Sequence, residues 1–462
     1  MRVARADPVG LAAGHDAPGH SFSLSQRIVM PDPSRALSGN SDLSPDAAHR
    51  LIATRLAVLC DARGAALSTE RLPLAQALDR VLADDVVAPI DVPAHDNSAM
   101  DGYAFAHAGL PDGEPVSLPV VGRALAGRPH DGDVGRGMAV RIMTGAAMPE
   151  GTDTVVPIEA ATCSPARVQF ARAAVRPGAN RRHAGEDWAR GDIALPAGTV
   201  LRPPALGVLA SLGIASVAVR RRLRVAVFST GDELREPGDA LPAGAIYDSN
   251  RFNLLAMLRR LGVEPLDLGI VPDDPAALRQ VLVDAARLAD AVITSGGVSA
   301  GDADHVRAAV AASGEVEYWK LALRPGRPFA FGTLRVPADA TAQPRQSVPF
   351  FGLPGNPAAV VATFYLLVRD ALLRLAQARA EPVPRVPATT TAALPKRAGR
   401  AEVIRARAQR DGGGWTVAPV GSPSSGALNA MVQANCLVLL EAERAAVNAG
   451  DTVDVTFFDG LL

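Results

Sequence analysis

Between residues 223 and 376 the chain alternates short apolar β-type runs with segments of helical pattern, and this alternation is the strongest constraint on its fold. The expected strands cover residues 223–228, 264–270, 291–294 and 348–352, and the expected helices cover residues 250–261, 273 onwards, 303–312 and 357–376. Strands that alternate with helices of about 10–15 residues predict a three-layer α/β domain with a mostly parallel sheet. Ligands of such sheets bind where the carboxyl ends of the strands turn into helix N-termini.

Outside this region the pattern predicts helical segments and two small β domains. Ser44-Pro45-Asp46 suits the start of a helix, a second helix is expected at residues 74–82, and residues 201–219 are again helical and apolar. Short runs between Gly/Pro turns predict a β-rich domain, with strands near residues 116–121, 138–142, 154–158 and 168–170. After a Pro-rich joint at residues 381–387, a last β domain is expected from runs at residues 403–408, 415–420, 436–440 and 452–457.

Composition narrows the classes of function. With 47 Lys and Arg against 48 Asp and Glu, the net charge of -1 argues against a general nucleic-acid binder. No uncharged apolar run reaches the roughly 20 residues that a membrane helix needs. The cysteines Cys60, Cys163 and Cys436 share no metal-ligand spacing, so a reduced cytoplasmic protein is expected. Residues 1–43, rich in Pro, Gly, Ser and Asp, are expected to form a disordered extension.

Several common chemistries are excluded because their motifs are missing. A Walker A loop needs a lysine after a glycine, and neither Lys320 nor Lys396 follows one. The chain has no His-Glu-x-x-His helix and no G-x-G-x-x-G sequence after an expected strand. A P-loop nucleotidase, a zincin and an NAD dehydrogenase are therefore not expected.

Acidic residues follow several of the expected parallel strands. Ser229-Thr230-Gly231-Asp232-Glu233 comes directly after the first strand, and further acids stand in later strand-to-helix loops, namely Asp273, Asp274, Asp302 and Asp304. Each could be a helix cap or a turn residue when taken alone. Several acidic loops on one sheet edge would repel one another unless a cation intervened, which favours a site for a hard cation such as Mg²⁺.

Other loops of the same region suit anions. The glycine-rich Ser295–Asp302 has amides that can receive a phosphate, although such loops also serve as plain turns. Lys320, Arg324 and Arg327 lie within eight residues, and an extended backbone would put Lys320 and Arg324 on one face, unless this is only a solvated edge. Leu353–Pro357 reads as a tight start to a helix whose N-terminus favours an anion.

The β-rich region carries three motifs that are each explained as turns when taken alone. They are Asp96-Asn97-Ser98-Ala99-Met100-Asp101-Gly102-Tyr103-Ala104, Met143-Thr144-Gly145 and Gly185-Glu186-Asp187. Taken in order with Ser229–Leu234, Ser295–Ser299, Trp319-Lys320 and Gly352–Pro357, these motifs resemble the molybdopterin molybdenumtransferase family, which includes MoeA and the E domain of gephyrin-like proteins. The resemblance covers about residues 44–462, and the first motif matches the family's D-N-S-A-M-D-G-Y-A segment at every position.

The resemblance implies an architecture and a reaction. It implies a discontinuous helical domain at residues 44–90 and 191–220, an inserted β-rich domain at 91–190, a molybdopterin-binding α/β domain at 221–380 and a C-terminal β-barrel at 381–462. The implied reaction is the Mg²⁺-dependent insertion of molybdate into adenylylated molybdopterin, with release of AMP, in the biosynthesis of the molybdenum cofactor. The implied partners are a second copy of the chain in a homodimer, an upstream molybdopterin adenylyltransferase and proteins that accept the cofactor, without nucleic acid or membrane.

The resemblance also implies roles for individual residues. Its catalytic positions fall on Asp101, Thr144, Glu233, Asp274, Asp304 and Lys320, of which Glu233, Asp274 and Asp304 would hold the metal. Its positions for the molybdopterin, nucleotide and oxyanion fall on Asp187, Ser229, Thr230, Gly231, Asp232, Ser295, Gly296, Gly297, Ser299, Arg324, Arg327, Pro354, Asn356, Arg405 and Ser425.

Three departures from the family pattern concern the oxyanion more than the nucleotide. The family's K-P-G-K-P is here Arg324-Pro325-Gly326-Arg327-Pro328, so planar guanidinium groups replace compact ammonium groups. Ala358-Ala359 stands where the family commonly has V-S, and residues 424–430 lose two hydroxyl groups of the family's G-S-H-x-x-S-S segment. Three alternatives therefore stay open, namely a paralogue that prefers tungstate, a scaffold of the same fold without turnover, and an enzyme acting on another nucleotide-linked substrate.

Overall fold

The computed structural model describes residues 42–63, 67–298, 304–337, 347–379, 383–421 and 428–458. The extension expected at residues 1–43 lies almost wholly outside the described residues, as do Ser299, Asp302 and Ser425. Asp304 is described only as the backbone position at which a helix begins. Within the described residues, no helix is long and apolar enough to cross a membrane.

A six-stranded sheet forms the centre of the α/β domain. Its order is β16 (Glu264–Val271), β13 (Arg224–Thr230), β17 (Ala291–Ser295), β21 (Ser347–Leu353), β20 (Pro328–Arg335) and β18 (Gly314–Lys320). The first four strands are parallel, whereas β20 and β18 join antiparallel. The prediction of a mostly parallel sheet is therefore confirmed, although β18 and β20 were not among the expected strands.

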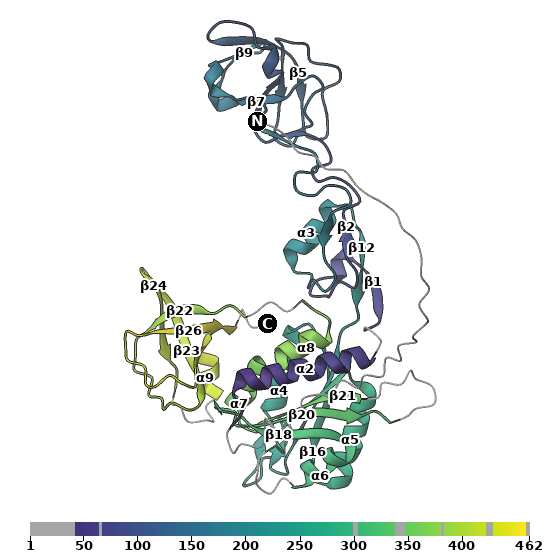
Figure 1. Ribbon diagram of the computed structural model, residues 1–462, viewed down its shortest axis with the longest axis vertical. Coiled ribbons are helices and arrows are strands. Elements are labelled where there is room, and N and C mark those ends of the chain that lie inside the picture. The colour runs from purple at the N-terminus through teal and green to yellow at the C-terminus, as the bar shows by residue number, and fades with distance from the viewer. Residues whose placement is uncertain are drawn as a thin grey trace, which may run out of the picture. The chain divides into compact units, whose positions relative to one another are not determined.

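Helices cover both faces of this sheet (Figure 1). On one face α5 (Pro275–Leu288) and α6 (Asp304–Ser313) bury leucines, valines and alanines against Phe228 and Phe350. The other face is covered by α2 (Pro45–Arg63), α4 (Asn250–Arg260), α7 (Pro357–Thr363), the π-helical turn η5 (Phe364–Val368) and α8 (Arg369–Leu375). The long helix expected after residue 357 is thus interrupted by a π-helical turn.

The register of the parallel strands brings their carboxyl ends to one edge. Ser229 of β13 lies opposite Ser295 of β17, and Ser295 lies opposite Leu353 of β21. On the other side of β13, Thr230 lies opposite Val271, the last residue of β16. The four strand-to-helix loops therefore start within a few residues of one another, which is the edge at which ligands of parallel sheets bind.

A second six-stranded sheet makes up the inserted β-rich domain. Its order is β7 (Thr154–Pro157), β4 (Gly102–Phe105), β6 (Ala139–Ile142), β5 (Val116–Ala124), β9 (Arg167–Phe170) and β8 (Thr162–Cys163). The rings of Phe105 and Phe170 stack in its core with centroids 5.1 Å apart. The four expected runs coincide with β5, β6, β7 and β9. The strand β4 begins within the motif Asp96–Ala104, which the sequence alone explained as a turn.

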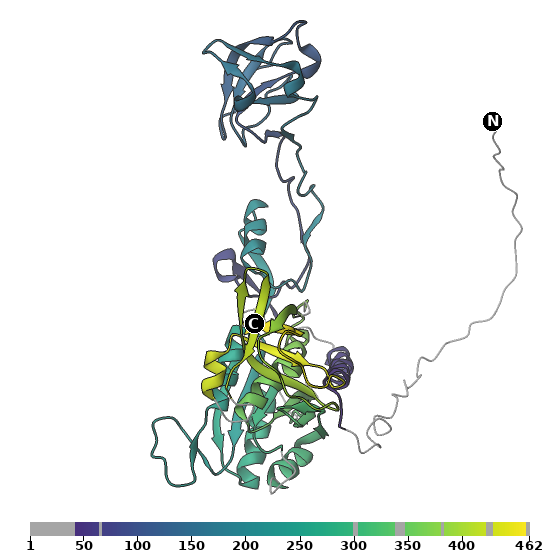
Figure 2. The same cartoon turned by 90° about the vertical axis from the view of Figure 1, so that its left-hand side faces the viewer.

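Short ladders of strands lead into and out of this domain (Figure 2). The pairs are β1 (Thr69–Pro73) with β12 (Ser216–Arg220), β2 (Val86–Val87) with β11 (Ile193–Leu195) and β3 (Asn97–Ser98) with β10 (Arg181–Arg182). All three ladders are antiparallel, so the incoming and outgoing segments of the chain run side by side.

The helix expected at residues 74–82 is wrong. Only Leu74–Gln76 is helical, as the 3₁₀ helix η1, and Asp79 has a φ of 59°, which a continuing helix excludes. The apolar residues that suggested a helix, such as Ala77 and Leu82, are instead buried beside α3 (Pro203–Ser211). The helical interpretation of residues 201–219 holds only for α3, because Gly213 with φ 74° ends it and β12 follows.

The C-terminal part is a closed barrel, as expected. Its strands are β22 (Val386–Thr390), β23 (Ala401–Asp411), β24 (Gly414–Pro419), β25 (Cys436–Leu440) and β26 (Thr452–Phe457). The ring closes because β23 pairs with both β24 and β25. The two-residue strand β19 (Leu323–Arg324) of the α/β domain also pairs with β23, so the barrel and the α/β domain share a backbone ladder.

Candidate active site

The acidic loop after β13 is folded back on itself. The Thr230 hydroxyl donates to an Asp273 carboxylate oxygen at 2.6 Å, and the Asp273 amide donates to Asp232 at 3.1 Å. A Cβ atom at Gly231 would collide with the Glu233 carboxylate, so this carboxylate lies over the glycine at the end of β13. The loops after β13 and β16 are therefore tied together, and the Glu233 side chain is left exposed to solvent.

Asp274 is a helix cap, one of the two roles expected for it beside that of a metal ligand. One of its carboxylate oxygens accepts from the amides of Ala276 and Ala277 at 2.9 and 2.8 Å, which makes it the N-cap of α5. Asp274 and Glu233 nevertheless follow adjacent parallel strands, and Asp304 begins the helix after β17. These three predicted metal ligands thus come from loops of one sheet edge.

The donor set can be tested against a magnesium ion. Among the described residues, no three His, Cys, Asp or Glu side chains lie close enough to form a metal cage. Mg²⁺ in phosphate-handling proteins is commonly bound by one or two carboxylates together with substrate phosphates and water. The exposed Glu233 carboxylate, a hard oxygen donor beside a glycine, fits this kind of site.

The loop after β17 accepts only glycine at two positions. Gly296 and Gly297 have φ angles of 95° and 68°, a backbone conformation that residues with a Cβ atom rarely adopt. A Cβ atom at Gly296 would lie 2.7 Å from the Thr230 carbonyl oxygen, and one at Gly297 would lie 2.7 Å from Val306. The loop is thereby packed between the end of β13 and α6, as a backbone that receives a ligand closely would require.

Two buried serines stand at the ends of β13 and β17. The Ser229 hydroxyl has no hydrogen-bond partner among the described residues, while Ser295 donates to the Pro354 carbonyl at 3.4 Å. Pro354 is buried, and Asn356 caps α7 by accepting from the amides of Ala358 and Ala359 at 3.0 and 3.4 Å. The segment after β21 is thus the tight helix start that the sequence predicts.

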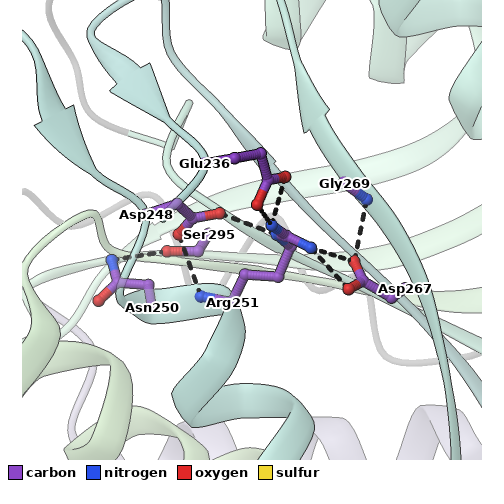
Figure 3. A network of polar contacts seen from close by, with 7 residues as sticks. All are labelled: Glu236, Asp248, Asn250, Arg251, Asp267, Gly269 and Ser295. Carbon is purple, nitrogen blue, oxygen red and sulfur yellow. Dashed lines mark hydrogen bonds and ion pairs between the residues drawn. The ribbon is translucent and has the colours of Figure 1, made fainter. Parts of the chain in front are cut away.

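A residue that joins these loops was not among those predicted from the sequence. Asn250, the first residue of α4, donates from its side-chain nitrogen to the Ser295 hydroxyl at 2.9 Å (Figure 3). The same nitrogen donates to the Gly355 carbonyl at 2.7 Å. It therefore ties the loop after β17 to the loop after β21. The only signal in the sequence was a polar run, Asp248-Ser249-Asn250-Arg251, placed before a helix at the same sheet edge.

The cationic segment does not run straight as expected. The strand β18 ends at Lys320 and β20 begins at Pro328, and the Leu321 amide donates back to the Arg327 carbonyl at 2.6 Å. This bond continues the pairing of Lys320 with Pro328, so the placement of Lys320 and Arg324 on one face stays a prediction. Gly326, with a φ of 114°, permits the turn. All three cationic side chains remain exposed.

A cavity of about 540 Å³ lies where the barrel meets the α/β domain. Its charged lining consists of Arg324, Glu402 and Arg405, with Arg324 3.6 Å from Glu402. Arg405 on β23 is buried, and this burial lowers the pKa of its guanidinium below the ordinary value. Ala358, at the position of a departure from the family pattern, also lines the cavity. This hollow with arginines in its wall suits an anion.

The predicted residues of the β-rich domain form two separate contacts. The Thr144 amide and hydroxyl both donate to one oxygen of Asp101 at 2.7 Å. These bonds, the amide bond first, lower the pKa of the Asp101 carboxyl below its ordinary value. Asp187 forms an ion pair with Arg182 at 3.1 Å instead. Both carboxylates are solvent-accessible on the surface of this domain.

Comparison with known proteins assigns each part of the chain to a described region. Residues 43–213 match the MoeA N-terminal region (domain I and II), residues 226–374 match a probable molybdopterin binding domain, and residues 387–458 match the MoeA C-terminal region (domain IV). A crystal structure of the molybdopterin biosynthesis MoeA protein from Pyrococcus horikoshii OT3 superposes with a TM-score of 0.71 and 26% identity, over 90% of this chain and 100% of that one.

Curated relatives match over nearly their whole length. The molybdopterin molybdenumtransferase of Haemophilus influenzae is 42% identical over 396 residues, which is 85% of this chain and 95% of the relative. The molybdopterin molybdenumtransferase 2 of Mycobacterium tuberculosis is 37% identical over 394 residues, 83% of this chain and 94% of the relative. The chain therefore belongs to the molybdopterin molybdenumtransferases, a family of transferases.

Proposed function

We propose that this protein inserts molybdate into adenylylated molybdopterin and releases AMP, in a reaction that depends on Mg²⁺. Membership of the family makes it a protein of molybdenum cofactor biosynthesis. The observation that carries the finer proposal is the cavity between the barrel and the α/β domain, because its wall holds Arg324 and Arg405. The same domain offers a glycine loop for phosphate at its sheet edge.

The cationic side chains address the main physical obstacle to this reaction. Molybdate is a dianion and the organic substrate carries phosphates, so the reactants repel each other. Two like unit charges about 4 Å apart cost about 4 kcal/mol at an effective dielectric constant near 20. Arg405, buried in the cavity wall, would hold the oxyanion, while the exposed Lys320 and Arg327 would neutralise charge on the phosphates.

The carboxylates serve the nucleotide end. Glu233 would hold the magnesium ion, and Asp274, as the N-cap of α5, orients the loop beside it. When bound, the magnesium ion supplies positive charge to the pyrophosphate oxygens as the bond to AMP breaks. Oxo groups of molybdate leave as water only if protons reach them, and the Lys320 ammonium is a group of this chain that can deliver a proton.

The test is a direct assay of AMP release. Purified protein with Mg²⁺, molybdate and adenylylated molybdopterin is expected to release AMP, and Glu233→Gln is expected to lower kcat by about 10²–10³-fold, as loss of a single charge-stabilising group does. Glu264→Gln is the control, because Glu264 is as exposed but lies at the opposite end of the sheet. Release of AMP no faster than in a blank without protein would contradict the proposal and favour a scaffold without turnover.

Tungstate is the second candidate substrate, and Ala358 is the observation that favours it. Ala358 lines the cavity at the first position of the pair where the family commonly has V-S, so the wall of the cavity differs from the family pattern there. Running the AMP assay with molybdate and tungstate side by side compares kcat/KM for the two anions directly. A tungstate value above the molybdate value would replace the proposed substrate and keep the rest of the proposal.

We also propose that the chain works as a homodimer that receives its substrate from an adenylyltransferase and hands the cofactor to acceptor proteins. Support comes from the family resemblance of the motifs. Light scattering on the purified protein is expected to give about twice the chain mass of 47.8 kDa. A mass of one chain at the concentrations used for the assay would refute the dimer.

A further inference from the structure

The segment of residues 231–248 is a small element that stands apart from the main sheet. Its strands β14 (Leu234–Arg235) and β15 (Ile246–Tyr247) pair with each other and form a sheet of their own. The Ile246 amide donates to the Glu233 carbonyl at 2.8 Å, and the Asp248 amide donates to the Arg235 carbonyl at 3.0 Å. Residues 237–244 between the strands are all exposed. The Asp273 amide holds Asp232 at the start of the segment, but the rest of the segment needs an anchor outside its own ladder.

Arg251 on α4 supplies this anchor (Figure 3). Its guanidinium donates to both oxygens of Glu236 at 2.5 Å and to Asp248 at 3.0 Å, at the two sides of the segment. It also donates to both oxygens of Asp267 on β16, at 2.5 and 2.6 Å. The Arg251 side chain thus joins the segment, its own helix α4 and the strand β16 of the main sheet.

The Arg251 cluster combines buried and half-exposed charged side chains. The side chains of Arg251 and Asp248 are 4% and 1% exposed, whereas Glu236 and Asp267 are 44% and 40% exposed. Burial lowers the pKa of Arg251, but its bonds to Asp267 and Asp248 outweigh burial and raise the pKa above the ordinary value. Within the described residues, every ion pair between the segment and the rest of the chain ends on Arg251.

The anchored segment carries Glu233. Glu233 immediately precedes β14, its carbonyl is held by β15, and Glu236 follows three residues later. We propose that Arg251 is a positioning residue that fixes the backbone of Glu233 at the carboxyl end of β13, acting through Glu236 and Asp248. The proposal rests on the proposed function only where it assigns Mg²⁺ to Glu233, since the anchoring itself concerns the backbone.

The test weakens the anchor at its exposed end and leaves buried charges paired. Glu236→Gln keeps the size of the side chain but removes its charge, while Glu264→Gln removes an equally exposed glutamate, 46% accessible and 3.5 Å from Arg224, at the far end of the sheet. Hydrogen exchange of the Ile246 amide is measured first, because its bond to the Glu233 carbonyl reports on the segment. It is expected to exchange about two- to fivefold faster in Glu236→Gln, the effect of losing a half-exposed ion pair, and to stay unchanged in Glu264→Gln.

The second measurement is the Mg²⁺ concentration for half-maximal AMP release. Glu236→Gln is expected to raise it about threefold to tenfold with kcat less affected, because the carboxylate is displaced and not removed. Asp267→Asn repeats the test from the sheet side of Arg251 if Glu236→Gln does not fold. Unchanged Ile246 exchange in the folded variant would overturn the positioning role. Faster exchange with an unchanged Mg²⁺ requirement overturns the link to the metal, and absence of AMP release by the unsubstituted protein is a failure of the proposed function alone.

Discussion

At the scale of single residues, the pair Asp101 and Thr144 gives a measurable prediction. Thr144→Val removes the hydroxyl donor but leaves the backbone amide, which is the larger cause of the lowered pKa. The pKa of Asp101 is therefore expected to rise in the variant and still to stay below the ordinary 3.8. A carboxyl NMR titration measures this, and an unchanged Asp101 pKa would show that the hydroxyl bond is absent in solution.

The same pKa shift fixes the sign of a pH effect. A carboxyl whose pKa is lowered by folding contributes stability above its unfolded pKa and loses this contribution as the pH falls through the folded value. The contribution of Asp101 is therefore complete at neutral pH and disappears only below about pH 4. Because the side chain is on the surface, its effect belongs to the local contact with Thr144 and not to the fold as a whole.

Cys163 and Cys436 differ in solvent exposure, and a labelling experiment can measure the difference. Cys436 is buried, and burial raises the pKa of its thiol to about 11, while Cys163 is exposed. Cys163 is expected to react with iodoacetamide at pH 8 and Cys436 to remain unlabelled until the barrel unfolds. Mass spectrometry of the labelled peptides checks this, with Cys163→Ser as the control. Labelling of both thiols at equal rates would mean that the barrel opens in the native protein.

The thiol of Cys436 also has a pH effect of the opposite sign. Its folded pKa lies above the ordinary value of 9.0, so its contribution to stability is complete below pH 9. That contribution is lost as the pH rises from about 9 to about 11, because only the unfolded state gains the thiolate there. The barrel is therefore expected to weaken in alkaline solution where Asp101 has no influence.

At the scale of elements, Lys396 joins two loops of the barrel. Its ammonium is buried and donates to the carbonyls of Ala442 and Arg444 at 3.2 and 2.6 Å. Lys396→Met is expected to lower the local free energy of opening by about 2 kcal/mol, because charged hydrogen bonds are lost. Hydrogen exchange of the β25 amides measures this, and Lys320→Met at the exposed lysine is the matched control. Equal exchange in both variants would assign Lys396 no structural role.

Helices and strands were predictable where an apolar pattern and the residues that end it agreed. The parallel strands β13, β16, β17 and β21 were expected nearly to their ends, because apolar runs of strand length stop at Gly, Asp or Pro residues. The helix at residues 74–82 failed because its apolar residues pack against α3, more than a hundred residues away, and this packing does not need helical spacing. The apolar pattern of residues 74–82 therefore predicted which residues are buried, but not their backbone conformation.

Local conformations in the candidate site were predictable where the residues are consecutive in the sequence. Gly296 and Gly297 could be recognised because a glycine pair directly after a strand is a local signal. Arg251 could not, because its partners Glu236 and Asp267 lie 15 and 16 residues away on either side. Nothing in a single sequence shows that three acids and one arginine will converge. The same limit hid the cavity, since Arg324 and Arg405 are far apart in the sequence and line one hollow near the pairing of β19 with β23.

At the scale of the whole molecule, the cavity predicts which anions stabilise the protein. A ligand at about 100 times its Kd adds about 2.7 kcal/mol to the stability of the state that binds it. Molybdate is therefore expected to raise the Tm of the unsubstituted protein, and Arg405→Leu is expected to abolish the rise. Arg410→Leu is the control, because Arg410 lies on the same strand but is exposed. A rise that survives in Arg405→Leu would place the anion elsewhere.

The paired ladders at the base of the β-rich domain have a consequence for the history of the chain. Val86–Val87 runs beside Ile193–Leu195, and Val92 bridges Trp188, so the segment between them leaves and returns at one point. A stretch whose two ends are neighbours can be gained, lost or exchanged in a single recombination event without rerouting the polypeptide. The β-rich domain is thus an insertion whose two ends lie side by side. Replacement of the domain would leave the carboxyl edge of the α/β sheet and the pairing of β19 with β23 in place.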